Sequence, residues 1–159
     1  MKAIRHTGIV VSDMERSLEF YRDLLGLKVV EDYKESGEYI DKILGLSGVK
    51  LWIIKLAAND GTMIELLKYM SHPQKAPDTL QVYDIGHSHI AFTVADVGKE
   101  YTRLSDKGVK FNCPPLVSPD GYAKVAFCRD PDGILIELVE VQIKNKLKTA
   151  GVSKIRKGS

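Results

Sequence analysis

The feature that most constrains this chain is an internal repeat, in which two short patterns each occur twice in the same order. The run His6–Asp13 (HTGIVVSD) resembles His89–Asp96 (HIAFTVAD), and Asp60–Leu66 (DGTMIEL) resembles Asp132–Leu138 (DGILIEL). Self-similarity of this kind is typical of a supersecondary unit present in two copies. Each copy opens an apolar run with a histidine and later places a glutamate inside another apolar run. The fold therefore has to accommodate two equivalent halves.

Each half predicts a strand, a helix and three further strands. Apolar residues recur at helical spacing after Ser12, which has capping-box spacing to Glu15, and again after Asp96, which is the expected N-cap of the second helix. The helices are expected over 14–25 and 97–107, each followed by a glycine suited to a left-handed C-cap, Gly26 and Gly108. Strands are expected over 4–11, 27–33, 49–57 and 62–69, then over 88–94, 109–112, 122–128 and 134–141.

This order predicts an α+β fold made of paired βαβββ modules, whose β-sheets curl to form a cleft. The modules span residues 3–70 and 84–142 and together form a single domain over residues 1–142, with 70–83 as the linker between them. Residues 38–46 predict a short helix that the second half lacks, and 113–121, with three prolines, predict a loop. The first half therefore carries an insertion, and we expect substrate preference to reside there.

Residues 143–159 form a basic tail that we expect to be disordered. The net charge of the chain is +2, but the charged residues from Gln142 onwards are all basic: Lys144, Lys146, Lys148, Lys154, Arg156 and Lys157. The tail contains no aromatic residue to stack on a base, so we expect no nucleic-acid partner.

No apolar run is long enough to span a membrane and no signal-peptide pattern is present, which predicts a cytoplasmic protein without a membrane partner. Cys113 and Cys128 are expected to be reduced thiols.

Two glutamates carry the chemistry that the repeat implies. Because neighbouring strand residues alternate faces, Glu65 and Glu137 each lie on a strand whose two faces are both apolar. A carboxylate buried there is costly unless it is paired, protonated or bound to a metal. Each glutamate is matched by a histidine on the first strand of its half, His6 or His89. Two imidazoles and two carboxylates suit a divalent ion such as Zn, Ni, Mn, Co or Fe.

The same residues carry a resemblance to the vicinal oxygen chelate superfamily of glyoxalases, bleomycin resistance proteins and dioxygenases. The resemblance covers roughly residues 3–142 and rests on four segments: 6–13, 17–27, 89–92 and 127–137. It implies metal ligands on the first and last strands of each module, which here are His6, Glu65, His89 and Glu137. A three-ligand version, as in extradiol dioxygenases, would need only His6, His89 and Glu137. Bleomycin-binding members dispense with the metal.

The four-ligand set points to the lyase and isomerase branch, and 125–138 resembles glyoxalase I most closely. The resemblance implies a metal-dependent lyase or isomerase of the lactoylglutathione lyase type, which transfers a proton next to a metal-chelated carbonyl through an enediolate. Glu137, or else Glu65, would act as the catalytic base. The alternatives are a methylmalonyl-CoA epimerase-like enzyme, an extradiol dioxygenase, and a metal-free small-molecule binding or resistance protein.

The resemblance also implies a small-molecule substrate and a homodimer. It leaves the cosubstrate open between glutathione and coenzyme A, because no set of glutathione-binding residues is identifiable in the sequence.

Overall fold

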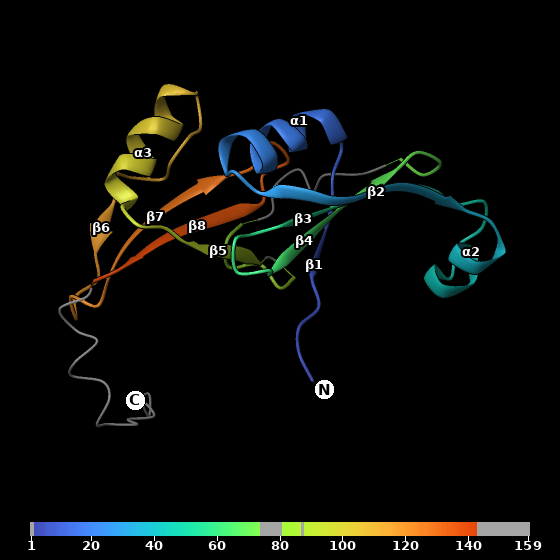
Figure 1. Cartoon of the computed structure of the whole chain (residues 1–159), viewed down its shortest axis with the longest axis horizontal. Helices are drawn as coiled ribbons and strands as arrows, with labels where there is room; N and C mark the ends of the chain where they lie inside the picture. Colours follow the sequence, from blue (N-terminus) through green and yellow to red (C-terminus); the bar gives the residue numbers. More distant parts are fainter. Residues whose placement is uncertain (1, 74–80, 87, 143–159) are drawn as a thin grey trace. The chain divides into compact units, whose positions relative to one another are not determined.

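The structure is a computed structural model that describes residues 2–73, 81–86 and 88–142. The chain divides into two compact units, Met1–Gln81 and Val82–Ser159, and each is described by itself (Figure 1). The basic tail from residue 143 onwards and most of the expected linker, residues 74–80, lie outside the described residues. In the part of the chain that is described, no helix is long and apolar enough to cross a membrane.

The first unit is a four-stranded sheet with strand order β1-β4-β3-β2. β1 runs parallel to β4, whereas the β2–β3 and β3–β4 pairs are antiparallel. Its elements, in chain order, are β1 (Thr7–Val10), α1 (Met14–Leu18), η1 (Glu19–Leu24), β2 (Lys28–Ser36), α2 (Glu38–Leu44), β3 (Lys50–Ala57) and β4 (Met63–Tyr69). The predicted short helix of the insertion is thereby confirmed as α2.

The second unit repeats this sheet, with strand order β5-β8-β7-β6 and a parallel β5–β8 pair. Its elements are β5 (His89–Thr93), α3 (Val97–Asp106), β6 (Leu116–Val117), β7 (Ala123–Arg129) and β8 (Leu135–Val141). The predicted α+β class and the βαβββ order of both halves are thus confirmed. The predicted strand over 109–112 is wrong, because only Phe111 makes an isolated bridge, to Cys128. The second strand of this unit lies instead at β6, inside the segment expected to be a loop.

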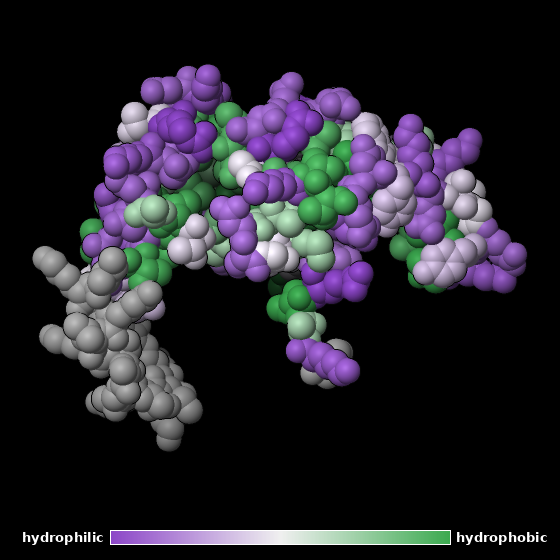
Figure 2. All heavy atoms as spheres, viewed as in Figure 1, coloured by the Kyte–Doolittle hydropathy of each residue, from purple (hydrophilic) through white to green (hydrophobic). Residues whose placement is uncertain are grey.

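The first helix begins at Met14, as predicted, but its N-cap differs from the one that the capping-box spacing indicated. Asp13, not Ser12, is the N-cap, and its side chain accepts a hydrogen bond from the Arg16 amide at 3.0 Å. From Glu19 the helix continues as the π-helical segment η1, and Gly26 follows it with φ 78°. The second helix was predicted correctly, since Asp96 caps α3 through the Lys99 amide. Figure 2 shows hydrophilic residues over the outer surfaces of α1 and α3.

The two faces of the first sheet are covered by different helices. One face carries the buried Ile54, Leu56, Ile64 and Leu66 and lies on the side of α1, which contacts β4 and buries Met14 and Leu18 of its own. The other face carries Lys55 and Glu65, which are register partners on β3 and β4. The second sheet repeats this division, with Ile136 and Leu138 fully buried and Glu137 on the opposite face.

The α2 insertion covers the face that carries Glu65. Ile40 of α2 packs in a cluster with Val49, Leu51 and Ile53, against which Leu67 and Tyr69 also lie. Strand parity places Leu51, Ile53, Leu67 and Tyr69 on the same face as Glu65. Figure 1 draws α2 at the end of β2, away from α1. The carboxylate of Asp41 holds α2 in place by accepting hydrogen bonds from the Gly48 and Val49 amides, both at 2.8 Å.

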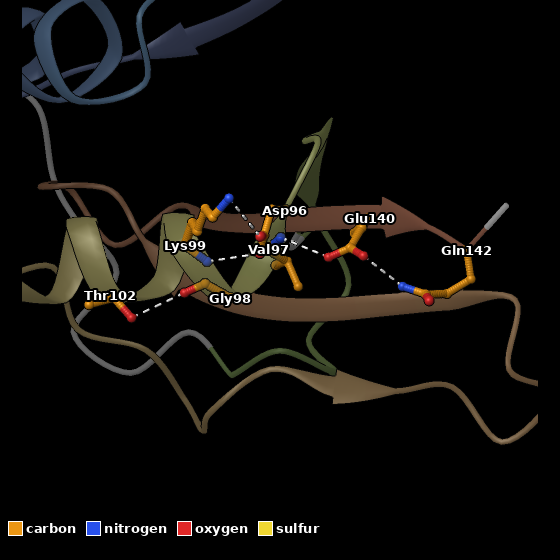
Figure 3. Close-up of polar contacts among 7 residues, drawn as sticks. All are labelled: Asp96, Val97, Gly98, Lys99, Thr102, Glu140 and Gln142. Atoms are coloured by element: carbon orange, nitrogen blue, oxygen red, sulfur yellow. Dashed lines mark hydrogen bonds and ion pairs between the residues drawn. The ribbon is translucent and has the colours of Figure 1, made fainter.

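The helices of the two units are fastened to their last strands by opposite charges. In the second unit Glu140 of β8 accepts a hydrogen bond from the Val97 amide at 2.9 Å, and Gln142 donates to the same carboxylate at 2.8 Å (Figure 3). In the first unit Lys68 occupies the matching place on β4 and donates to the carbonyl oxygen of Ser12. A carboxylate therefore binds the start of α3, whereas an ammonium binds the turn before α1.

Candidate metal-binding His–Glu pairs

The first candidate pair lies on the β1–β4 edge of the first sheet. His6 directly precedes β1, and its Nε2 lies 3.3 Å from Oε2 of Glu65 on β4. The side chains are 28% and 13% exposed, respectively. Gly8 is the register partner of Glu65, so no β1 side chain stands directly beside the carboxylate. A Cβ at Gly8 would lie 4.0 Å from Oε2 of Glu65 and 3.4 Å from Cδ1 of Leu67, so a side chain here would crowd the carboxylate.

The second candidate pair repeats the first on the β5–β8 edge. His89 opens β5, and its Nε2 lies 3.2 Å from Oε2 of Glu137 on β8. The His89 ring also makes an edge contact with the ring of Phe127, with centroids 5.8 Å apart. His89 is half exposed, and the Glu137 side chain is 19% exposed.

The two pairs share one geometry because they share one register. Gly8 pairs with Glu65 and Ala91 pairs with Glu137, so each histidine stands two residues before the register partner of its glutamate. A separation of two residues along a strand keeps both side chains on one face. Both carboxylates are largely buried, with 13% and 19% of their side chains exposed. Each also shares its face of the sheet with apolar side chains, as the sequence predicted for both faces of these strands.

The donor atoms of each pair fit neighbouring positions around one divalent ion. Two ligand atoms at about 2.1 Å from a zinc-sized ion lie about 3.0 to 3.4 Å apart at octahedral or tetrahedral angles. The observed Nε2–Oε2 separations of 3.3 and 3.2 Å fall in this range. Nδ1 of His6 is buried and has no hydrogen-bond partner among the described residues, so the partner seen for this ring is Glu65 at Nε2.

Each His–Glu pair has no third candidate metal ligand beside it in the part of the chain that the structure describes. Among the described residues, no group of three or more His, Cys, Asp or Glu gathers where it could hold an ion. The first unit thus brings together His6 and Glu65, and the second brings together His89 and Glu137. The grouping of all four ligands remains a prediction.

Lys55 is a charged neighbour of the first pair that was not predicted from the sequence. It is the register partner of Glu65, its side chain is 11% exposed, and its Nζ lies 2.6 Å from Oε2 of Glu31 and 3.9 Å from Oε1 of Glu65. The hydrogen bond to Glu31 raises the pKa of Lys55 above its usual value. The signal was a lysine inside the apolar run of 51–57, on a strand that is otherwise largely buried.

Each unit has the same sheet, with a histidine at the start of its first strand and a glutamate on its last strand. The fold is therefore built from two modules, and each module carries one copy of the same polar site. The chain belongs to the glyoxalase/bleomycin resistance protein/dioxygenase superfamily, whose sequence model matches residues 3–138. This superfamily includes many enzymes. The family assignment predicted from the four sequence segments is thus confirmed.

The chain is similar to several proteins and solved structures. It is 33% identical over 144 residues to a probable lactoylglutathione lyase from Synechocystis sp., covering 87% of this chain and 95% of the relative. It is 32% identical over 135 residues to the uncharacterized protein YurT from Bacillus subtilis, covering 84% and 95%. Among solved structures, a glyoxalase family protein from Bacillus cereus superposes with a TM-score of 0.80 at 25% identity, covering 89% and 95%.

Proposed function

We propose that this protein is a divalent-metal-dependent lyase or isomerase of the glyoxalase type. The observation that carries the proposal is the duplicated His–Glu pair, with the same register relation and nearly the same donor separation in both units. His6, Glu65, His89 and Glu137 would hold one ion together. Relatives named lactoylglutathione lyase support the reaction class.

The chemistry follows from the residue types. A bound divalent cation supplies Lewis-acid stabilisation of negative charge on a carbonyl oxygen. Glu137 takes the proton from the carbon next to that carbonyl and returns it to the neighbouring position. Its Oε2 faces His89, and no second ion-pair partner of Glu137 is found among the described residues, which leaves Oε1 for the proton. Glu65 stays with His6 as a ligand.

Deuterium exchange from solvent tests this reaction class directly. The metal-loaded protein in D₂O is offered the hemithioacetal of methylglyoxal with glutathione and, separately, a 2-methyl-branched acyl-CoA, and deuterium in each compound is followed by mass spectrometry. We expect exchange into the hemithioacetal, and a loss on the order of a hundredfold in Glu137→Gln, which removes the base. Exchange into the acyl-CoA alone would instead favour an epimerase.

The controls distinguish loss of the catalytic base from loss of the bound metal. Glu137→Gln is compared with Glu140→Gln, a change three residues along the same strand, outside the His–Glu pair. Metal content of each purified variant is measured by elemental analysis. Exchange into neither compound by a metal-loaded wild-type protein would reject the proposal, and full exchange by Glu137→Gln would reject the assigned base.

A homodimer acting on a small molecule is part of the same proposal. Light scattering coupled to size-exclusion chromatography measures the mass in solution, and a mass of one chain would reject the dimer.

A further inference from the structure

The two repeat-related glutamates have different neighbours across the sheet. The register partner of Glu65 on β3 is Lys55, whereas the register partner of Glu137 on β7 is Phe127. These partners occupy the same position in the repeat, since β3 and β7 each stand next to the last strand of their unit. One His–Glu pair is therefore flanked by an ammonium and the other by an aromatic ring.

Lys55 is held tightly where it stands. Its ammonium lies 2.6 Å from Glu31 and 3.9 Å from Glu65, and 5.5 Å from the ring centre of Tyr33. These three partners lie on the same face of the sheet, and the lysine side chain is only 11% exposed. A side chain anchored at several points loses little further entropy when it holds a neighbour in one orientation.

The contacts divide the two oxygens of Glu65 between two partners. Oε2 faces His6 at 3.3 Å, and Oε1 faces Lys55 at 3.9 Å. Among the described residues, Glu137 makes one such contact, between Oε2 and His89 at 3.2 Å. Both oxygens of Glu65 thus lie near a basic group, whereas one oxygen of Glu137 does.

We propose that Lys55 is a positioning residue that fixes Glu65 as a one-oxygen ligand and lowers the affinity of the site for a divalent cation. The inference rests on the proposed function, because it concerns the same ion. An ammonium beside a ligand carboxylate competes with the cation for that carboxylate and repels it. Glu31 offsets part of this repulsion, so the effect on cation affinity is moderate. Phe127 exerts no such competition on Glu137, which therefore stays free to move the proton.

Metal titration of the full-length protein without substrate tests this proposal. Co²⁺ and Zn²⁺ are each titrated into metal-stripped wild type, Lys55→Met, Lys55→Phe, Lys55→Arg and Lys34→Met, with calorimetry as the readout. Lys55→Phe copies the residue found at Phe127. Lys34→Met is the matched control, because it removes the same charge from neighbouring β2 on the opposite face, where Lys34 lies over Trp52.

We expect Lys55→Met and Lys55→Phe to bind both ions about tenfold more tightly than wild type, because they remove the competing charge. Lys55→Arg keeps the charge and should bind like wild type, and Lys34→Met should change affinity less than threefold. Thermal unfolding identifies any variant that does not fold, and either neutral variant alone suffices for the comparison.

Equal or weaker binding by a folded neutral variant would overturn the role of Lys55, as would the same increase in Lys34→Met. Either result leaves the proposed function standing if wild type binds the ions. Failure of wild type to bind either ion would overturn both the proposed function and this inference.

Discussion

At the residue scale, the positions of the four candidate ligands follow from strand parity and register. The alternation of faces predicts that Glu65 and Glu137 share a face with their neighbours two residues away, and the structure has this arrangement. Parity does not say which face is covered by a helix. Both faces of β4 are apolar, as predicted, but Ile64 and Leu66 are buried on one face whereas Glu65 stays partly exposed on the other.

Lys55 shows why the remainder of the site was not predicted. Its role depends on Glu31 and Glu65, which are distant in sequence and become neighbours only through the β2–β3 and β3–β4 register. The irregularity between Val29 and Glu31 shifts the register of β2, and it decides that Glu31, and not the preceding residue, pairs with Lys55. A bulge of this kind has no dependable sequence signal.

The two cysteines should differ sharply in reactivity. Burial, with a smaller contribution from the charge of Asp130, raises the pKa of the Cys128 thiol to about 11, whereas Cys113 is exposed. At pH 8 the thiolate fraction of Cys128 is then on the order of one in a thousand. We expect iodoacetamide to label Cys113 in the native protein and to leave Cys128 nearly unmodified.

Peptide mass spectrometry measures both labelling rates between pH 7 and pH 9. Unfolding in urea should remove the difference, because burial causes it. Equal rates in the native protein would show that Cys128 is not shielded.

At the scale of elements, α2 is the insertion that distinguishes the two halves. Its presence could be predicted, because residues 38–46 have helical spacing and no counterpart in the second half. Its position over the Glu65 face could not be predicted, since that depends on Ile40 reaching Leu51 and Ile53. The helix α2 therefore packs on the face of the sheet that carries the first His–Glu pair.

Asp41 should stabilise the attachment of α2 to the chain that follows it. Asp41→Ala removes two hydrogen bonds to the chain that follows α2, and we expect a loss of about 1 to 2 kcal/mol in local stability. Hydrogen exchange of the Gly48 and Val49 amides measures it, and both amides should exchange faster. Glu38→Ala is the control, because Glu38 forms an exposed pair with Lys42 and takes no part in the two Asp41 hydrogen bonds. Unchanged exchange in Asp41→Ala would show that Ile40 alone fixes the helix.

At the scale of the whole molecule, the repeat predicted most of the fold. Two matched patterns were enough to predict two modules with the same element order, since each pattern marks the first or the last strand of a module. The segment between Gly108 and β7 was the exception. Its three prolines indicate a loop, yet Leu116 and Val117 pair with Val125 and Lys124 at the sheet edge, where proline is tolerated nearby.

The proposed joint site would bind one ion per chain, whereas two separate His–Glu sites would bind two. If both His–Glu pairs hold the same ion, His6→Ala and His89→Ala should each abolish tight binding, because each removes a ligand from a shared site. Equilibrium dialysis against Zn²⁺, with elemental analysis of the protein, measures bound ion per chain. Retention of half the wild-type capacity in each variant would indicate two independent sites.

The opposite charges that fasten α1 and α3 also differ in how they interact with the helix dipole. The carboxylate of Glu140 lies at the amide of Val97, the first residue of α3, where the positive end of the helix dipole stabilises a negative charge. The ammonium of Lys68 binds the carbonyl oxygen of Ser12, just before α1, where the dipole gives a positive charge no such stabilisation. We therefore expect the carboxylate to hold the start of α3 more firmly than the ammonium holds the start of α1.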